Sequence, residues 1–112
     1  MSGEDAPSHP SMDIVDVNAH RGQFFRVLQR TARSQTAVMT IAAGEEAGPP
    51  ETHDADQIVY VIEGEALITV GDERRRTGPG TLVMIPAGVR HHVRNPGRLP
   101  LFFLTVYAPP EY

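Results

Sequence analysis

Four side chains that can bind a cation or move a proton occur in two short polar segments of the sequence. Glu51 and His53 follow a Pro-Pro pair, and Gln57 opens an apolar run a few residues later. His91 lies in the second segment, directly before His92. Carboxylate, imidazole and amide groups can all ligate divalent metal ions. These residues can share one ion only if the fold brings the two segments together.

Glu51 and His53 can act together if the chain around them is extended. In a strand, residues i and i+2 point to the same face and lie about 6.6 Å apart along it, a distance from which long side chains converge on one ion. His91 and His92 are neighbours, so a strand places them on opposite faces. Only one of the two can therefore join the site, and we expect His92 to lie outward.

The elements that must position these residues are short β-strands. Val, Ile, Phe, Tyr and Thr are frequent in the runs between turns, and 10 Gly and 10 Pro in 112 residues separate the runs. No segment keeps a helical period. Many short strands with tight turns predict an all-β sandwich or barrel. The expected strands are Asp13–Val17, Phe24–Arg30, Gln35–Ala42, Gln57–Glu63, Glu65–Val70, Arg74–Thr77, Thr81–Ile85, Val89–Arg94 and Leu99–Tyr107.

Two of these runs are apolar at every position, Ile58–Ile62 and Leu101–Leu104. A strand with one face in water would alternate apolar and polar residues. Both faces of these strands are therefore expected to be covered, one by the interior and the other by a second subunit. This pattern predicts a homodimer. Within the first run, alternation places Gln57, Val59 and Val61 together on the face that we assign to the interior.

Length and composition exclude several classes of protein. The 112 residues predict one domain over 13–112 after a flexible N-terminal tail over 1–12, which is rich in Pro, Ser and acidic residues. The absence of Cys excludes disulfides and thiolate sites, and the absence of Lys excludes Schiff-base chemistry. A net charge of −4 argues against nucleic acid, and no apolar run is long enough to cross a membrane. Without a signal-like N-terminus, the cytoplasm is the expected compartment.

The spacing of the second segment resembles the second motif of the cupin superfamily. The motif reads Gly80-x5-Pro86-x-Gly88-x2-His91-x3-Asn95 and matches at each position. The first cupin motif, Gly-x5-His-x-His-x(3 or 4)-Glu-x6-Gly, is matched only in its second half, by Gln57-x6-Gly64 with His53 three residues ahead. The resemblance implies a small single-domain cupin with a double-stranded β-helix, a jelly-roll-like barrel.

The resemblance also implies a ligand set for a metal ion, at Glu51, His53, Gln57 and His91. Glu51 stands where the family has a histidine, and Gln57 stands where it has a glutamate. The set therefore holds two imidazoles, one carboxylate and one amide in place of three imidazoles and one carboxylate, with the same single negative charge. A neutral amide oxygen is a weaker and harder donor than imidazole, and the expected cofactor is Mn²⁺, Fe²⁺, Ni²⁺ or Zn²⁺.

Two functions follow from this resemblance. In the first, the metal acts as a Lewis acid on a small organic molecule and Glu51 accepts a proton, in an isomerase, decarboxylase, lyase or oxygenase type of reaction. In the second, the protein is a non-catalytic binding or sensor cupin, with or without a metal. The chain has few groups that move protons in the interior, which weighs against the enzyme. The expected substrate-binding walls are apolar and comprise Val59, Val61 and Val93 with some of Phe25, Met39, Met84 and Phe103.

Overall fold

The chain folds as two antiparallel β-sheets that face each other. The computed structural model describes residues 11–112, so most of the expected tail, 1–10, lies outside the described residues. A short 3-10 helix, η2 (Val17–His20), precedes the sheets. The strands are β1 (Arg26–Arg30), β2 (Gln35–Ile41), β3 (Asp56–Glu63), β4 (Ala66–Val70), β5 (Glu73–Thr77), β6 (Leu82–Ile85), β7 (His91–Arg94) and β8 (Leu101–Ala108).

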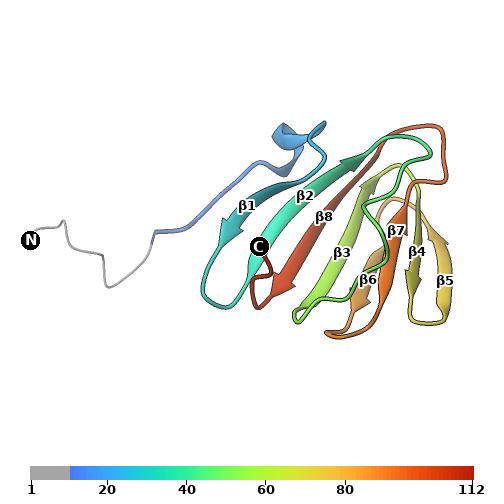
Figure 1. Ribbon diagram of the computed structural model, residues 1–112. Coiled ribbons are helices and arrows are strands. Elements are labelled where there is room, and N and C mark those ends of the chain that lie inside the picture. The colour runs from blue at the N-terminus through green and yellow to red at the C-terminus, as the bar shows by residue number, and fades with distance from the viewer. Residues whose placement is uncertain (1–10) are drawn as a thin grey trace, which may run out of the picture.

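The strand order explains how distant segments become neighbours. One sheet has five strands in the order β1-β2-β8-β3-β6, and the other has three in the order β5-β4-β7 (Figure 1). The last strand, β8, is inserted between β2 and β3, so that Val61 of β3 and Met39 of β2 both lie opposite Phe103. The expected all-β architecture is confirmed, and the described residues contain no helix with the length and apolar character to cross a membrane.

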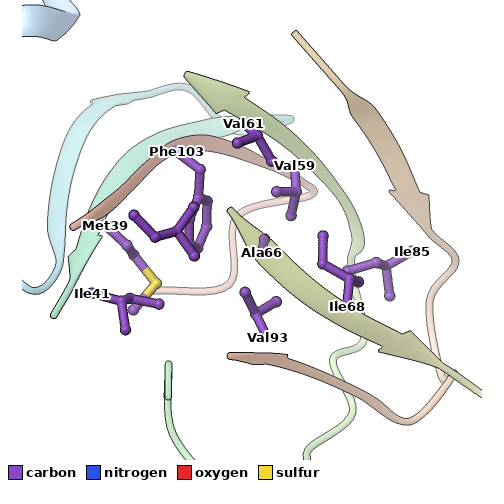
Figure 2. Packing of buried hydrophobic residues seen from close by; sticks show 10 residues of the cluster. Met39, Ile41, Val59, Val61, Ala66, Ile68, Ile85, Val93 and Phe103 are labelled. Carbon is purple, nitrogen blue, oxygen red and sulfur yellow. The ribbon is translucent and has the colours of Figure 1, made fainter. Parts of the chain in front are cut away.

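The core lies between the two sheets and is built by strand alternation. Val59 and Val61 of β3 and Phe103 of β8 point from the five-stranded sheet toward Ile68 of β4 and Val93 of β7 (Figure 2). All five are between 0% and 4% exposed. Burial of each such side chain contributes roughly 1.5–3 kcal/mol to stability. The expectation that Val59 and Val61 face the interior is confirmed.

The expected strand Asp13–Val17 is wrong. Residues 11–16 have no regular structure, and Val17 begins the 3-10 helix. The carboxylate of Asp16 accepts a hydrogen bond from the Asn18 N–H at 3.1 Å, which caps that helix. Asp and Asn favour such local hydrogen bonds over a strand ladder, and this preference outweighed the valines around them.

Asn95, the last residue of the second motif, joins the loop between β7 and β8 to the end of β2. Its side chain is fully buried, and its amide nitrogen donates to the carbonyl oxygens of Ile41 at 2.9 Å and Leu99 at 2.8 Å. Its Oδ1 atom accepts from the Gly97 N–H at 2.9 Å. The motif therefore includes a structural residue as well as candidate ligands, because a buried amide must satisfy its hydrogen bonds.

Candidate functional site

Backbone hydrogen bonds join the two polar segments. The Glu51 N–H donates to the His91 carbonyl at 3.0 Å, and the His91 N–H donates back to the Glu51 carbonyl at 2.9 Å. In such a pair the two side chains leave the same face about 5.5 Å apart at their Cα atoms. The Gly88 N–H donates to the His53 carbonyl at 2.8 Å, so the turn before β7 also fixes the backbone of His53.

All four residues expected to bind the metal line one cavity. It lies between the sheets and has a volume of about 50 Å³, enough for an ion with a few water molecules. Its walls combine apolar, aromatic and polar side chains. They are Met39, Ala47, Gly48, Pro49, Glu51, His53, Gln57, His91, His92, Val93, Phe103, Tyr107 and Tyr112.

The two buried imidazoles are oriented by acceptors behind them. The ring centroids of His53 and His91 are 4.9 Å apart. The Nδ1 atom of His91 lies 3.1 Å from the Val89 carbonyl, and the Nδ1 atom of His53 lies 3.3 Å from a carboxylate oxygen of Glu111. The Val89 carbonyl can only accept, which places a proton on Nδ1 of His91, and the nearby Glu111 carboxylate favours a proton on Nδ1 of His53. The lone pair of each ring is consequently on Nε2.

Glu51 stands at the edge of the cavity with an exposed carboxylate. Its Oε1 atom lies 3.9 Å from the Nε2 atom of His53, and its side chain is 47% exposed. The carboxylate therefore stays hydrated and can rotate. Its negative charge also raises the pKa of the Tyr112 hydroxyl, although burial is the larger cause.

Gln57 lies on the floor of the cavity with half of its amide unsatisfied. Its Nε2 atom donates to Thr105 Oγ1 at 3.0 Å and lies 3.5 Å from the Tyr107 hydroxyl. Within residues 11–112, Gln57 Oε1 is the buried side-chain atom that has no hydrogen-bond partner. Leaving such an acceptor unpaired costs about 1–3 kcal/mol. The atom is therefore ready to accept a donor or to bind a cation.

Gln57, His53 and His91 fit a divalent ion only with help from Glu51. In the described part of the chain no three His, Cys, Asp or Glu side chains are already grouped closely enough to hold a metal. The amide oxygen and the two Nε2 atoms are neutral donors, and the mobile carboxylate is the single anion. Such a donor set can hold a divalent transition metal if the Glu51 side chain turns inward.

A family model described as a cupin domain matches residues 37–107, which include both polar segments and all or part of the seven strands from β2 to β8. The chain belongs to the cupin family.

Relatives of this cupin support the same fold. It is 26% identical over 112 residues to YrkC of Bacillus subtilis, an uncharacterized protein. The matched region covers 92% of this chain but only 60% of YrkC. The crystal structure of BH2720 from Bacillus halodurans superposes with a TM-score of 0.85 at 30% identity, covering 94% of this chain and 86% of the other. An RmlC-like cupin of Methanocaldococcus jannaschii, with a double-stranded β-helix fold, has a TM-score of 0.71 at 24% identity, covering 80% and 84% of the two chains. The expected cupin barrel is confirmed.

The apolar side chains expected to bind substrate take different positions in the cupin barrel. Met39, Val93 and Phe103 line the cavity. Val59 and Val61 lie in the core and not on the cavity wall. Phe25 packs on Tyr112, with ring centroids 4.9 Å apart. Contact of these residues with a substrate stays a prediction.

The interior position expected for Met84 is wrong, because its side chain is 57% exposed on the outer face of the five-stranded sheet. Ile58 lies opposite Met84, and Gln57 lies opposite Ile85. Since Gln57 points inward, so does Ile85, and Met84 has to point outward.

The motif does not predict Tyr107 and Tyr112 on the cavity wall, or Glu111 behind His53. Tyr107 could have been found, since it follows Phe103 and Thr105 at two-residue steps along β8. Burial raises the pKa of the Tyr107 hydroxyl well above its usual value. Glu111 and Tyr112 come from the segment after β8, where no periodicity indicates which way a side chain points.

Proposed function

We propose that this cupin binds a divalent transition metal and a small organic ligand in the cavity between its sheets. The unpaired Oε1 atom of Gln57 carries the proposal, because a cation would supply the partner that this buried acceptor lacks. The Nδ1 contacts of His53 and His91 support it, because they leave both Nε2 lone pairs toward the cavity side of the rings.

The charge balance of the site selects the class of ligand. Among the four ligating groups, the single carboxylate leaves a divalent ion with one positive charge, which the Glu111 carboxylate behind His53 offsets only from a distance. This charge favours a carboxylate, enolate or hydroxy-ketone oxygen. A metal bound there would supply Lewis acidity. Glu51, at the solvent edge of the cavity, would hold or accept a proton of the ligand. A cavity of about 50 Å³ restricts the ligand to a few atoms.

Metal titration of chelator-treated protein tests this function. We expect Mn²⁺, Fe²⁺, Ni²⁺ or Zn²⁺ to raise the unfolding free energy, by about 2.7 kcal/mol at a hundredfold excess over Kd. His91→Ala should abolish the effect, and His20→Ala, in the 3-10 helix and not on the cavity wall, should keep it. The double variant Glu51→His with Gln57→Glu should bind metal more tightly. A protein that binds none of the four metals by calorimetry, and whose unfolding temperature ignores them, would contradict the proposal.

A metal-free binding protein is the second candidate. It is favoured by the absence of a preformed group of three ionisable ligands in residues 11–112. In that case Gln57 Oε1 would accept a hydrogen bond from the ligand itself. Native mass spectrometry before and after chelation separates the two: a small molecule retained by metal-stripped protein supports this candidate.

We also propose that two copies associate through the outer face of the five-stranded sheet. Tyr60, Leu82 and Met84 are 41%, 67% and 57% exposed there, and Ile58 and Ile62 beside them are half-buried. Contiguous exposed apolar patches of this kind are typical of interfaces. A two-fold homodimer uses the same patch on both copies, so one apolar sheet face supplies both sides of such an interface.

A further inference from the structure

The segment after β8 turns back toward the body of the protein and is held there by a buried side chain (Figure 1). Gln35 is 1% exposed. Its Nε2 atom donates to the Tyr112 carbonyl at 2.6 Å, and its Oε1 atom accepts from the N–H groups of Tyr112 at 3.0 Å and Glu111 at 3.2 Å. Arg30 donates a further hydrogen bond to the Tyr112 carbonyl at 2.8 Å. These four bonds fix the backbone of Glu111 and Tyr112.

The fixed backbone places the Glu111 carboxylate behind the ring of His53. The Oε2 atom of Glu111 lies 3.3 Å from Nδ1 of His53, while Nε2 of the same ring lies 3.9 Å from Glu51. The His53 side chain is 6% exposed and that of Glu111 is 25% exposed, so the contact is largely shielded from water. An anionic acceptor close to one imidazole nitrogen favours the proton on that nitrogen and the ring orientation that turns it toward the acceptor.

Tyr112 covers the cavity from the same segment. Its ring centroid lies 5.3 Å from that of Tyr107, 6.0 Å from that of His53 and 4.9 Å from that of Phe25. One short segment therefore orients a candidate ligand and forms part of the cavity wall.

We propose that Pro109–Tyr112 is the closing element of the cavity and that Glu111 is a positioning residue for His53, held in place by Gln35. Glu111 keeps the proton of His53 on Nδ1, so that Nε2 presents its lone pair to the cavity. The consequence for metal affinity rests on the proposed function, but the orientation of the ring does not. Removal of the Glu111 carboxylate should therefore change His53 even in metal-free protein.

Nitrogen-15 NMR of the imidazole rings in metal-free protein tests the positioning directly. At about pH 8, above the usual pKa of histidine, His53 should be found as the Nδ1–H tautomer. Glu111→Ala should shift it toward Nε2–H, and Glu111→Gln, which keeps an acceptor of equal length, should retain part of the Nδ1–H form. Glu46→Gln is the matched control, because Glu46 contacts His92 at 2.8 Å and should change the signals of His92 alone.

Gln35→Ala tests whether the hydrogen bonds from Gln35 and Arg30 to Glu111 and Tyr112, called the clamp below, position Glu111 against His53. Gln35 does not touch His53, yet its loss should shift the tautomer in the same direction as Glu111→Ala. Should Gln35→Ala fail to fold, Arg30→Ala removes one bond of the clamp from the surface and should give a smaller shift. Zinc affinity should fall about ten- to hundredfold in Glu111→Ala, the usual effect of losing such a partner.

The outcomes separate the two proposals. An Nδ1–H tautomer that is unchanged in Glu111→Ala overturns the positioning role, whether or not metal binds. A shifted tautomer in a protein that binds no metal upholds the positioning role and rejects the metal function. A shifted tautomer with a lowered zinc affinity supports both.

Discussion

At the scale of single residues, the position of the negative charge is the feature that distinguishes this cavity. The carboxylate is at position 51, where the side chain is 47% exposed, and the neutral amide is at position 57, which is 5% exposed. An unpaired ionised carboxylate on the buried floor would carry a large desolvation cost. The amide lowers that cost in the empty cavity, and Glu51 can bring its charge inward when a cation arrives.

The buried Tyr107 hydroxyl should make the protein less stable as the pH rises into the alkaline range. Burial raises the pKa of its hydroxyl above the ordinary value, and the negative charges near it add to the shift. The unfolded chain releases this proton near pH 10 while the folded protein keeps it. The stabilising contribution is therefore complete below about pH 10 and is lost as the pH rises toward the folded pKa.

We expect the unfolding free energy to fall by up to about 1.4 kcal/mol per pH unit from this residue above pH 10. Tyr107→Phe keeps the ring and removes the titrating group, so its slope should be shallower. Urea unfolding at several alkaline pH values measures both proteins. If the unfolding free energy falls equally steeply with pH in wild type and in Tyr107→Phe, Tyr107 is not the source of the pH dependence.

At the scale of elements, the turns control how the strands meet. Gly64 directly follows β3 and Gly80 lies in the turn before β6, and both adopt the left-handed backbone, with φ of 84° and 86°. They differ in their surroundings. A Cβ atom at Gly64 would overlap the Pro100 carbonyl oxygen, and one at Gly80 would meet nothing within 4 Å.

Gly64→Ala and Gly80→Ala therefore separate backbone strain from steric overlap. Gly80→Ala should cost about 1–2 kcal/mol, the strain of a left-handed alanine. Gly64→Ala should cost clearly more, because the start of β8 must also move. Chemical denaturation of the two variants beside wild type gives the difference. Equal losses would show that the Pro100–Leu101 contact is easily relieved.

At the scale of the whole molecule, the two outer sheet faces differ in character. The five-stranded sheet exposes Leu82 and Met84. On the three-stranded sheet, Leu67 of β4 points outward between Ala66 and Ile68, and its cross-strand partners are Arg76 and Arg94. Only the first face offers a continuous apolar surface to a second copy.

Leu82→Asp should abolish the proposed dimer, because it places a charge in that apolar face. Leu67→Asp, with arginines on both sides, is the matched control and should remain dimeric. Light scattering after size exclusion should give twice the chain mass of 12.3 kDa for wild type and the control, and 12.3 kDa for Leu82→Asp. A wild-type protein that is monomeric at high concentration would refute the dimer.

Sequence by itself determined the features that depend on neighbouring residues. Alternation along Gln57, Val59 and Val61 predicted their common inward face. The adjacency of His91 and His92 predicted opposite faces: His91 is 5% exposed and His92 is half-buried, but both line the cavity, so the expected exclusion of His92 from it is wrong. Turn residues and motif spacing predicted the strands and the family. Strand alternation and turn geometry are short-range properties, so one chain segment contains the information they need.

Only the tertiary structure decided the contacts and side-chain directions that result from pairing between distant segments of the chain. The outward position of Met84 follows from its register against Ile58. Glu51 approaches His91 through an isolated backbone pairing, and Glu111 approaches His53 because the segment after β8 turns back. These contacts join residues 40 and 58 positions apart, where local preferences carry no information about which side chains meet.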